Sequence, residues 1–190
     1  FVLKTKQYWP DIESMVSVYL RHPQFSHFPV VGISFEQAKQ FCAWRTNRLN
    51  EVYYVNEHRN VTFPIDSSHV IPRKVEFRLP SEEEWELAAK VGFDSSRFVS
   101  NGEKFYFNTE ETASVRTVNH NYLRYIPMID YSLKPDKFNR YNLIGNVAEM
   151  INIKGIAKGG SYIHSTSDSY YTKRINYNSP EYWLGFRCVC

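Results

Sequence analysis

Two helix-start signals constrain the fold of this chain more than any other feature of its sequence. Ser34 is followed three residues later by Gln37, and Ser81 is followed three residues later by Glu84. In such a capping box the serine side chain and the third residue each satisfy a backbone amide group that the first helical turn leaves unpaired. Apolar residues recur at helical spacing behind both boxes. The sequence therefore predicts two helices, at about 35–50 and 81–90.

The rest of the chain predicts short strands joined by irregular segments. Residues 30–33 are mostly β-branched and predict a short buried strand. Residues 51–72 are polar and predict a long surface insertion, and residues 93–140 show little periodicity. Three later segments predict further strand pieces, at 143–147, 155–162 and 185–189. Together these patterns predict a single α+β domain over 1–190 with little regular secondary structure.

Composition excludes several classes of protein. The net charge is +3 and the basic residues are scattered, which argues against a nucleic-acid partner. No stretch is apolar enough to cross a membrane as a helix. Aromatic residues make up 16% of the chain, which fits either large rings filling a loop-rich core or a codon bias of the genome. The three cysteines do not by themselves indicate a disulfide framework.

Five segments carry recognisable motifs, at residues 29–44, 77–89, 141–150, 158–162 and 185–188. Taken in order, they resemble the signatures of the sulfatase-modifying factor family, whose founding activity is formylglycine generation. The resemblance implies a variant C-type-lectin-like fold that is low in regular secondary structure. The glycine- and methionine-containing strand with which the family usually opens is not found, so we expect the N-terminal part of the domain to be clipped or missing.

In the catalytic members that this chain resembles, two cysteines just after the Gly-Gly-Ser segment bind copper as thiolates. His164 and Ser169 stand at those positions here. A hydroxyl group is a poor ligand for Cu(I), and one imidazole does not replace two thiolates. The resemblance therefore implies degenerate catalytic positions and no copper. The alternative is a metal-dependent enzyme that uses His164, with Asp168 as a second ligand; a hydrogen-bonded, structural histidine is the simpler interpretation.

The resemblance also implies a disulfide between Cys42 and Cys188, which match family positions that pair with each other. Such a bridge requires an oxidising compartment. The alternative is two buried, reduced thiols. Cys190 is left over, either as a competitor for Cys42 or as a free thiol.

A calcium site is a further implication of the resemblance. The family can hold Ca²⁺ through an asparagine side chain, two carbonyl groups and a glutamate, and oxygen ligands of this kind suit that ion. The alternative is that the two side chains only brace a turn by local hydrogen bonds. The matching positions are Asn142, Gly145, Val147 and Glu149.

Two arginines flank the family-like segments. Arg78 and Arg187 could recognise an acidic partner, but bracing by carbonyl groups or by a glutamate of residues 82–86 is the simpler interpretation.

These observations lead to three functional hypotheses. The first is a non-catalytic interaction or scaffolding module of an exported cell-envelope complex, with protein partners. Residues 19–32 and 42–51 carry a narrower resemblance to gliding-motility and type IX secretion lipoproteins of Bacteroidetes, which implies a periplasmic or outer-membrane-associated location and a lipid anchor upstream. The second is a divergent oxidase or the His164-dependent enzyme. The third is a carbohydrate-binding lectin-like domain, although the sugar-binding triplets of true C-type lectins are absent.

Overall fold

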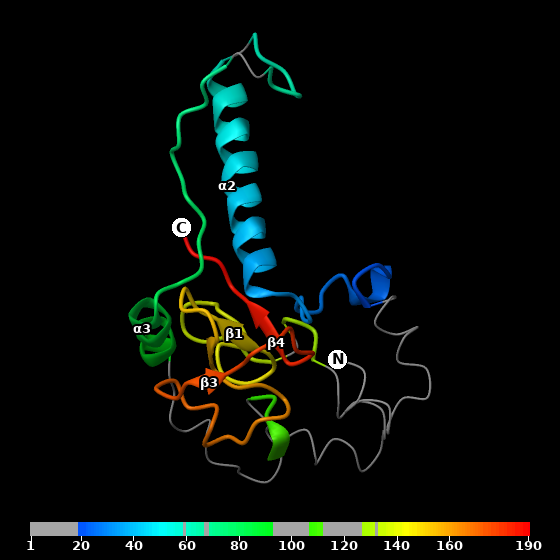
Figure 1. Cartoon of the computed structure of the whole chain (residues 1–190), viewed down its shortest axis with the longest axis vertical. Coiled ribbons are helices and arrows are strands. Elements are labelled where there is room, and N and C mark those ends of the chain that lie inside the picture. The colour runs from blue at the N-terminus through cyan, green and yellow to red at the C-terminus, as the bar shows by residue number, and fades with distance from the viewer. Residues whose placement is uncertain (1–18, 59, 67–68, 93–106, 112–126, 132) are drawn as a thin grey trace.

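A computed structural model of the chain describes residues 19–58, 60–66, 69–92, 107–111, 127–131 and 133–190. A long helix projects from a body that holds a small sheet and a second helix (Figure 1). This mixed α+β arrangement with few regular elements confirms the predicted fold class. The elements in chain order are the 3₁₀-helix η1 (Pro23–Phe25), α2 (Phe35–Glu57), α3 (Glu82–Gly92), β1 (Ala148–Met150), β2 (Ile156–Lys158), β3 (Ile175–Asn176) and β4 (Leu184–Phe186).

Both predicted capping boxes are present. Gln37 N donates to Ser34 Oγ over 3.2 Å, and Ser34 N donates to Gln37 Oε1 over 2.8 Å. At α3 the same pair of bonds joins Ser81 and Glu84, over 3.2 and 2.8 Å. The start of each helix therefore follows from its own sequence.

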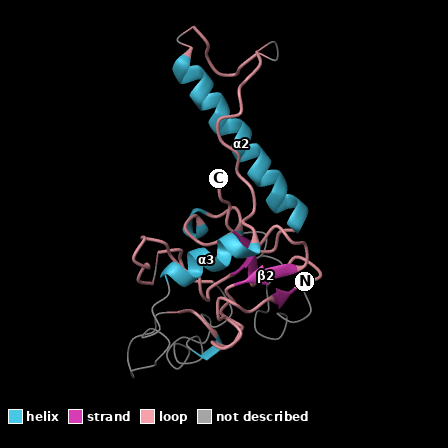
Figure 2. Ribbon diagram, turned by 90° about the vertical axis from the view of Figure 1, so that its left-hand side faces the viewer, coloured by secondary structure: helices cyan, strands magenta, loops and turns pink. Residues whose placement is uncertain are grey.

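Helix α2 is longer than predicted, because residues 51–57 continue it where a surface insertion was expected. Beyond the body, this part of α2 lies beside the extended segment around residues 74–77 (Figures 1 and 2). Asn50 and Thr46 are buried polar residues that hold the two together. The Asn50 side chain accepts from Lys74 N over 2.7 Å and donates to Val75 O over 2.8 Å, while Thr46 Oγ1 accepts from Phe77 N over 2.8 Å.

The sheet has four short strands in the order β3-β2-β1-β4. Neighbouring strands are antiparallel except for β1 and β4, which are parallel and pair Glu149 with Gly185. The predicted strand at residues 30–33 is wrong. Gly32 adopts a positive φ of 73°, which interrupts an extended strand, and its amide donates to Glu181 O.

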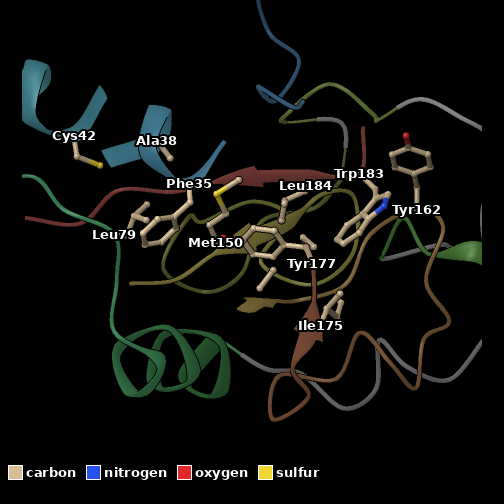
Figure 3. Packing of buried hydrophobic residues seen from close by; sticks show 12 residues of the cluster. Phe35, Ala38, Cys42, Leu79, Met150, Tyr162, Ile175, Tyr177, Trp183 and Leu184 are labelled. Carbon is tan, nitrogen blue, oxygen red and sulfur yellow. The ribbon is translucent and has the colours of Figure 1, made fainter. Parts of the chain in front are cut away.

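The main core lies between the start of α2 and the sheet (Figure 3). One face of α2 contributes Phe35, Ala38 and Cys42 to this core. They belong to the same buried cluster as Met150 of β1 and Leu184 of β4. A second cluster gathers around Trp85 of α3. Within the described residues, no helix combines the length and the apolar character that crossing a membrane requires.

Candidate functional site

The segment that follows Gly159-Gly160-Ser161 holds the two degenerate positions, and both side chains make local contacts. Ser161 Oγ lies 2.7 Å from His164 Nδ1, and the His164 ring stands edge-on to Trp183, with 4.8 Å between ring centroids. Ser169 Oγ donates to Ser165 O over 2.8 Å. Ser169 packs directly against Gly160. A Cβ atom at position 160 would come within 1.9 Å of Ser169 Oγ, which explains why this position is a glycine.

These contacts limit what the segment can do chemically. Burial lowers the pKa of His164 below its ordinary value, although Asp168 opposes this shift, so the imidazole is neutral at pH 7. The Asp168 carboxylate accepts from Ser165 Oγ over 2.7 Å, which is a bond to a serine and not to His164. Ser161 and Ser169 are fully buried and cannot reach a substrate as they stand. Among the described residues, no group of three or more His, Cys, Asp or Glu side chains is placed to hold a metal ion.

Glu149, the predicted acidic calcium ligand, is buried in β1 and already has partners. Arg187 Nη2 donates to Glu149 Oε1 over 2.8 Å, and Trp85 Nε1 donates to Glu149 Oε2 over 2.8 Å. The Glu149 charge raises the pKa of Arg187. Both carboxylate oxygens therefore face hydrogen-bond donors, and a guanidinium supplies the positive charge beside them.

Two of the other three predicted calcium positions, Gly145 and Asn142, are arranged differently. Gly145 O accepts from Val147 N over 2.9 Å within a tight turn. Asn142, at a positive φ of 53°, donates through Nδ2 to Asp130 O over 2.6 Å, and its Oδ1 is buried without a hydrogen-bond partner. Arg187 thus already neutralises the Glu149 carboxylate, while Asn142 Oδ1 accepts no hydrogen bond within the described part of the chain. Calcium binding stays a prediction for direct titration.

The structure brings Cys42 of α2 next to Cys188, which follows β4. Both are free thiols, as is the exposed Cys190. Burial, together with the neighbouring Cys188, raises the pKa of Cys42 to about 11. Arg45 Nη1 donates to Cys188 Sγ over 3.0 Å. The disulfide itself stays a prediction.

Bracing explains both arginines singled out in the sequence. Arg78 bonds the Glu84 carboxylate through two nitrogens, over 2.6 and 2.7 Å. Arg187 holds Glu149 and donates to Tyr141 O over 2.9 Å.

A pocket of about 810 Å³ opens where α2 meets the body, and no sequence pattern predicted it. Gln37, Phe41 and Arg45 line it from α2, while Asn142, Glu149 and Arg187 line it from the sheet side. Asp130 also lines it, although the sequence around this residue carries no recognisable motif. Sequence reasoning missed the pocket because its walls come from four separate stretches of chain.

Comparisons with known proteins identify the fold. The model of the family described as "Sulfatase-modifying factor enzyme 1-like domain" matches residues 4–190. Among solved structures, PvdO from Pseudomonas aeruginosa is 17% identical with a TM-score of 0.57 over 85% of this chain and 61% of that one. Treponema denticola variable protein 1 is 22% identical with a TM-score of 0.57 over 86% of this chain and 71% of that one.

These likenesses to solved structures concern the fold alone, since the identities are low. The chain spans less than two thirds of the PvdO chain that it matches. No curated protein sequence matches this one.

Proposed function

This chain belongs to the sulfatase-modifying factor enzyme 1-like domain family, and from that membership we propose that it is a non-catalytic protein-interaction module. The catalytic chemistry implied by the family resemblance needs two thiolates beside the Gly-Gly-Ser segment. Here the corresponding side chains are His164 and Ser169, and each is held in a local hydrogen bond. The scaffold is therefore retained while the copper ligands are replaced.

The observation that carries the proposal is an apolar stripe on the projecting helix α2. Phe41, Trp44 and Val52 are 43%, 56% and 40% exposed, respectively. Their spacing of three and eight residues keeps them on one face of a helix, away from the face that carries Ala38, Cys42 and the other buried residues. We call Phe41, Trp44 and Val52 the α2 stripe.

The α2 stripe has the chemistry of a protein-binding surface. The Phe41 ring lies 5.6 Å from Trp44 and 5.5 Å from Phe186 of β4, so an aromatic cluster continues from the helix onto the body. Exposed aromatic clusters are unusual on surfaces that face water alone, and buried Trp and Tyr anchors carry much of the energy of protein interfaces. A rigid helix that stands out from the body presents such anchors at little entropic cost.

A photo-crosslinking amino acid at position 44, expressed in the native cell, tests this proposal. We expect discrete protein adducts at position 44 and few at position 43, because Ala43 is exposed on a different face of the same helix. A matched measurement is the affinity of the captured partner for Trp44→Ala, which we expect to fall at least about tenfold. Equal adducts at both positions, or unchanged affinity, would contradict a role for the stripe.

We further propose that the module works in an exported envelope complex, of the gliding-motility or protein-secretion type. The adjacency of Cys42 and Cys188 supports this location, because two such thiols can join only where the compartment is oxidising. Alkylation of intact cells followed by mass spectrometry tests the proposal. Material in which both cysteines are alkylated without prior reduction would count against an exported, bridged domain.

A direct assay distinguishes the enzymatic alternative from the non-catalytic proposal. The purified protein, supplied with copper and a cysteine-containing peptide, should show no oxidation of the peptide above that of free copper. Turnover that is abolished by His164→Ala would overturn the non-catalytic proposal.

A further inference from the structure

One arginine lies where the α2 stripe meets the pocket at the base of α2. Arg45 follows Phe41 by four residues, so the two side chains are neighbours on the same side of the helix. Both residues line the pocket, and the Phe41 ring lies 5.5 Å from Phe186, which lines it from β4. A partner segment that covers Phe41 and Trp44 is therefore brought next to Arg45.

Arg45 has no carboxylate partner within the described part of the chain. Its guanidinium lies over the Phe77 ring, 4.2 Å from the ring centroid, and Nη1 donates to Cys188 Sγ over 3.0 Å. Sulfur is a weak acceptor, and these contacts leave most of the N–H groups of the guanidinium unused. Because the side chain is exposed, water solvates these groups until a partner displaces it.

The acidic side chains of α2 do not neutralise Arg45. All three carboxylates of this helix are already paired with other cations, so none is left to serve the arginine beside the stripe. The pairs are Glu36 with Lys154, Glu51 with Arg48 and Glu57 with Lys74.

The two other arginines of the pocket lining have partners of their own. Arg187 is paired with Glu149 over 2.8 Å, and Arg140 is paired with Asp136 over 2.7 Å. These four charges are therefore balanced pairwise, and neither carboxylate is available to Arg45.

Asp130, the remaining carboxylate of the lining, is not a partner of Arg45 either. Burial raises the pKa of Asp130, and the charges that modify this shift come from other parts of the chain and not from α2. An uncompensated positive charge therefore remains on the α2 side of the pocket. The charges that act on Asp130 are those of Arg187, Glu149 and His27.

We propose that the partner protein presents an acidic side chain here, with its carboxylate paired to Arg45 and its apolar neighbours packed on Phe41 and Trp44. The inference rests on the proposed function and specifies the partner as an acidic segment with apolar side chains. A guanidinium offers a carboxylate two parallel donors, and Trp and Arg are frequent anchors of interfaces. An ion pair in water is worth little, but a partner that lies on the two rings excludes water from beside Arg45 and strengthens the pair.

Other occupants fit this surface less well. A cationic side chain would meet the uncompensated charge of Arg45, and an apolar one would bury that charge without a partner, which is costly. An anionic membrane surface attracts clusters of cations. The other two cations on α2 do not form such a cluster with Arg45, because Arg48 is neutralised by Glu51 and Lys39 lies on a different face of the helix.

Titration with N-acetyl-phenylalanyl-glutamate amide, followed by NMR, tests the proposal without knowledge of the partner. The indole N–H signal of Trp44, assigned by its loss in Trp44→Phe, reports on the site. The matched probe is N-acetyl-phenylalanyl-glutamine amide, which keeps the shape and lacks the charge. The matched variants are Arg45→Gln and Lys39→Gln. Lys39 is an exposed cation of the same helix that also lies over a ring, that of Phe35 at 5.7 Å, but it is outside the described pocket lining.

We expect saturable shifts of the Trp44 signal with the glutamate probe and about threefold weaker binding of the glutamine probe. Arg45→Gln should lose this preference, while Lys39→Gln and the charge-conserving Arg45→Lys should keep it. Equal binding of the two probes, or a preference that survives in Arg45→Gln, would overturn the inference. So would tighter binding of sodium phosphate than of the glutamate probe, or shifts of the same signal on dilution of the protein alone, which would indicate a phosphate-bearing partner or a second copy.

The partner captured at position 44 separates this inference from the proposed function. Arg45→Gln should weaken its binding about tenfold and reduce the dependence of the affinity on salt. If Trp44→Ala weakens binding and Arg45→Gln does not, only the acidic side chain is refuted. If Trp44→Ala binds as the unaltered protein does, the proposed function fails.

Discussion

Replacement of Lys158 should reveal how α3 is held to the sheet. The Lys158 side chain is fully buried in β2, and its Nζ lies 2.6 Å from Glu86 Oε1 and 3.3 Å from Glu82 Oε1. Breaking a buried ion pair by removing one partner costs about 3–5 kcal/mol when the other charge is left uncompensated. The cost should be smaller here, because the Glu86 side chain is 32% exposed and Glu82 keeps its bond to Arg174.

We therefore expect Lys158→Met to lower the free energy of unfolding by about 1–2 kcal/mol, since methionine keeps most of the buried stem and loses only the charge. Lys158→Ala should cost about 2–4 kcal/mol, because it also leaves a cavity. Urea denaturation followed by tryptophan fluorescence and circular dichroism would give both values. Lys158→Met combined with Glu86→Gln should recover part of the loss.

The control is Lys154→Met, whose pair with Glu36 spans 3.4 Å between side chains that are 71% and 59% exposed. Its effect should stay within about 0.5 kcal/mol, as for most surface pairs. If Lys158→Met has the same free energy of unfolding as the unaltered protein, the reasoning is refuted. The buried ion pair would then add no stability beyond that of an apolar side chain in the same place.

Three other predictions follow from contacts described above. The Arg78 guanidinium and the Ser81 backbone amide lower the pKa of Glu84 from 4.5 to about 2. The ionised carboxylate therefore stabilises the fold above pH 4.5, and this contribution is lost as the pH falls toward 2. Glu84→Gln should flatten that part of a curve of stability against pH, measured by urea denaturation. Arg187→Gln should increase the rise in Tm on adding calcium chloride, because it frees the Glu149 carboxylate, and an unaltered response would show that the guanidinium does not block the ion. Oxidation of the purified protein should raise its Tm, and Cys188→Ser should abolish that rise if Cys42 and Cys188 form the bridge.

Local features of this fold could be predicted from the sequence because their causes are local. Ser34 and Ser81 mark the starts of α2 and α3, since a capping box involves only neighbouring residues. The predicted pieces at 155–162 and 185–189 overlap β2 and β4. The piece predicted at 143–147 is wrong, because Gly145 and Asn146 adopt positive φ and β1 begins only at residue 148, and β3 was not predicted. The strand predicted at residues 30–33 failed because a hydrophobic run cannot show that Gly32 adopts a positive φ.

Long-range features could not be predicted, because partners distant in sequence decide them. Residues 51–57 were expected to belong to a surface insertion, yet they continue α2, and Asn50 binds the backbone at residues 74–75 and holds that segment beside the helix. From the sequence Glu149 is predicted to be a calcium ligand. The sequence does not show that the parallel register of β1 and β4 places it next to Arg187. The position of Asp130 beside Asn142 has no sequence signal at all.

The parallel pairing of β1 with β4 has a consequence for biosynthesis. The partner that lies on one side of β1 is made about 35 residues later, and so is the arginine that neutralises Glu149. A nascent chain that has emerged only as far as β3 therefore exposes one edge of β1 and carries a glutamate without its countercharge. The sheet can close only after β4 has been synthesised, and until then this edge of β1 is open to pairing with other chains.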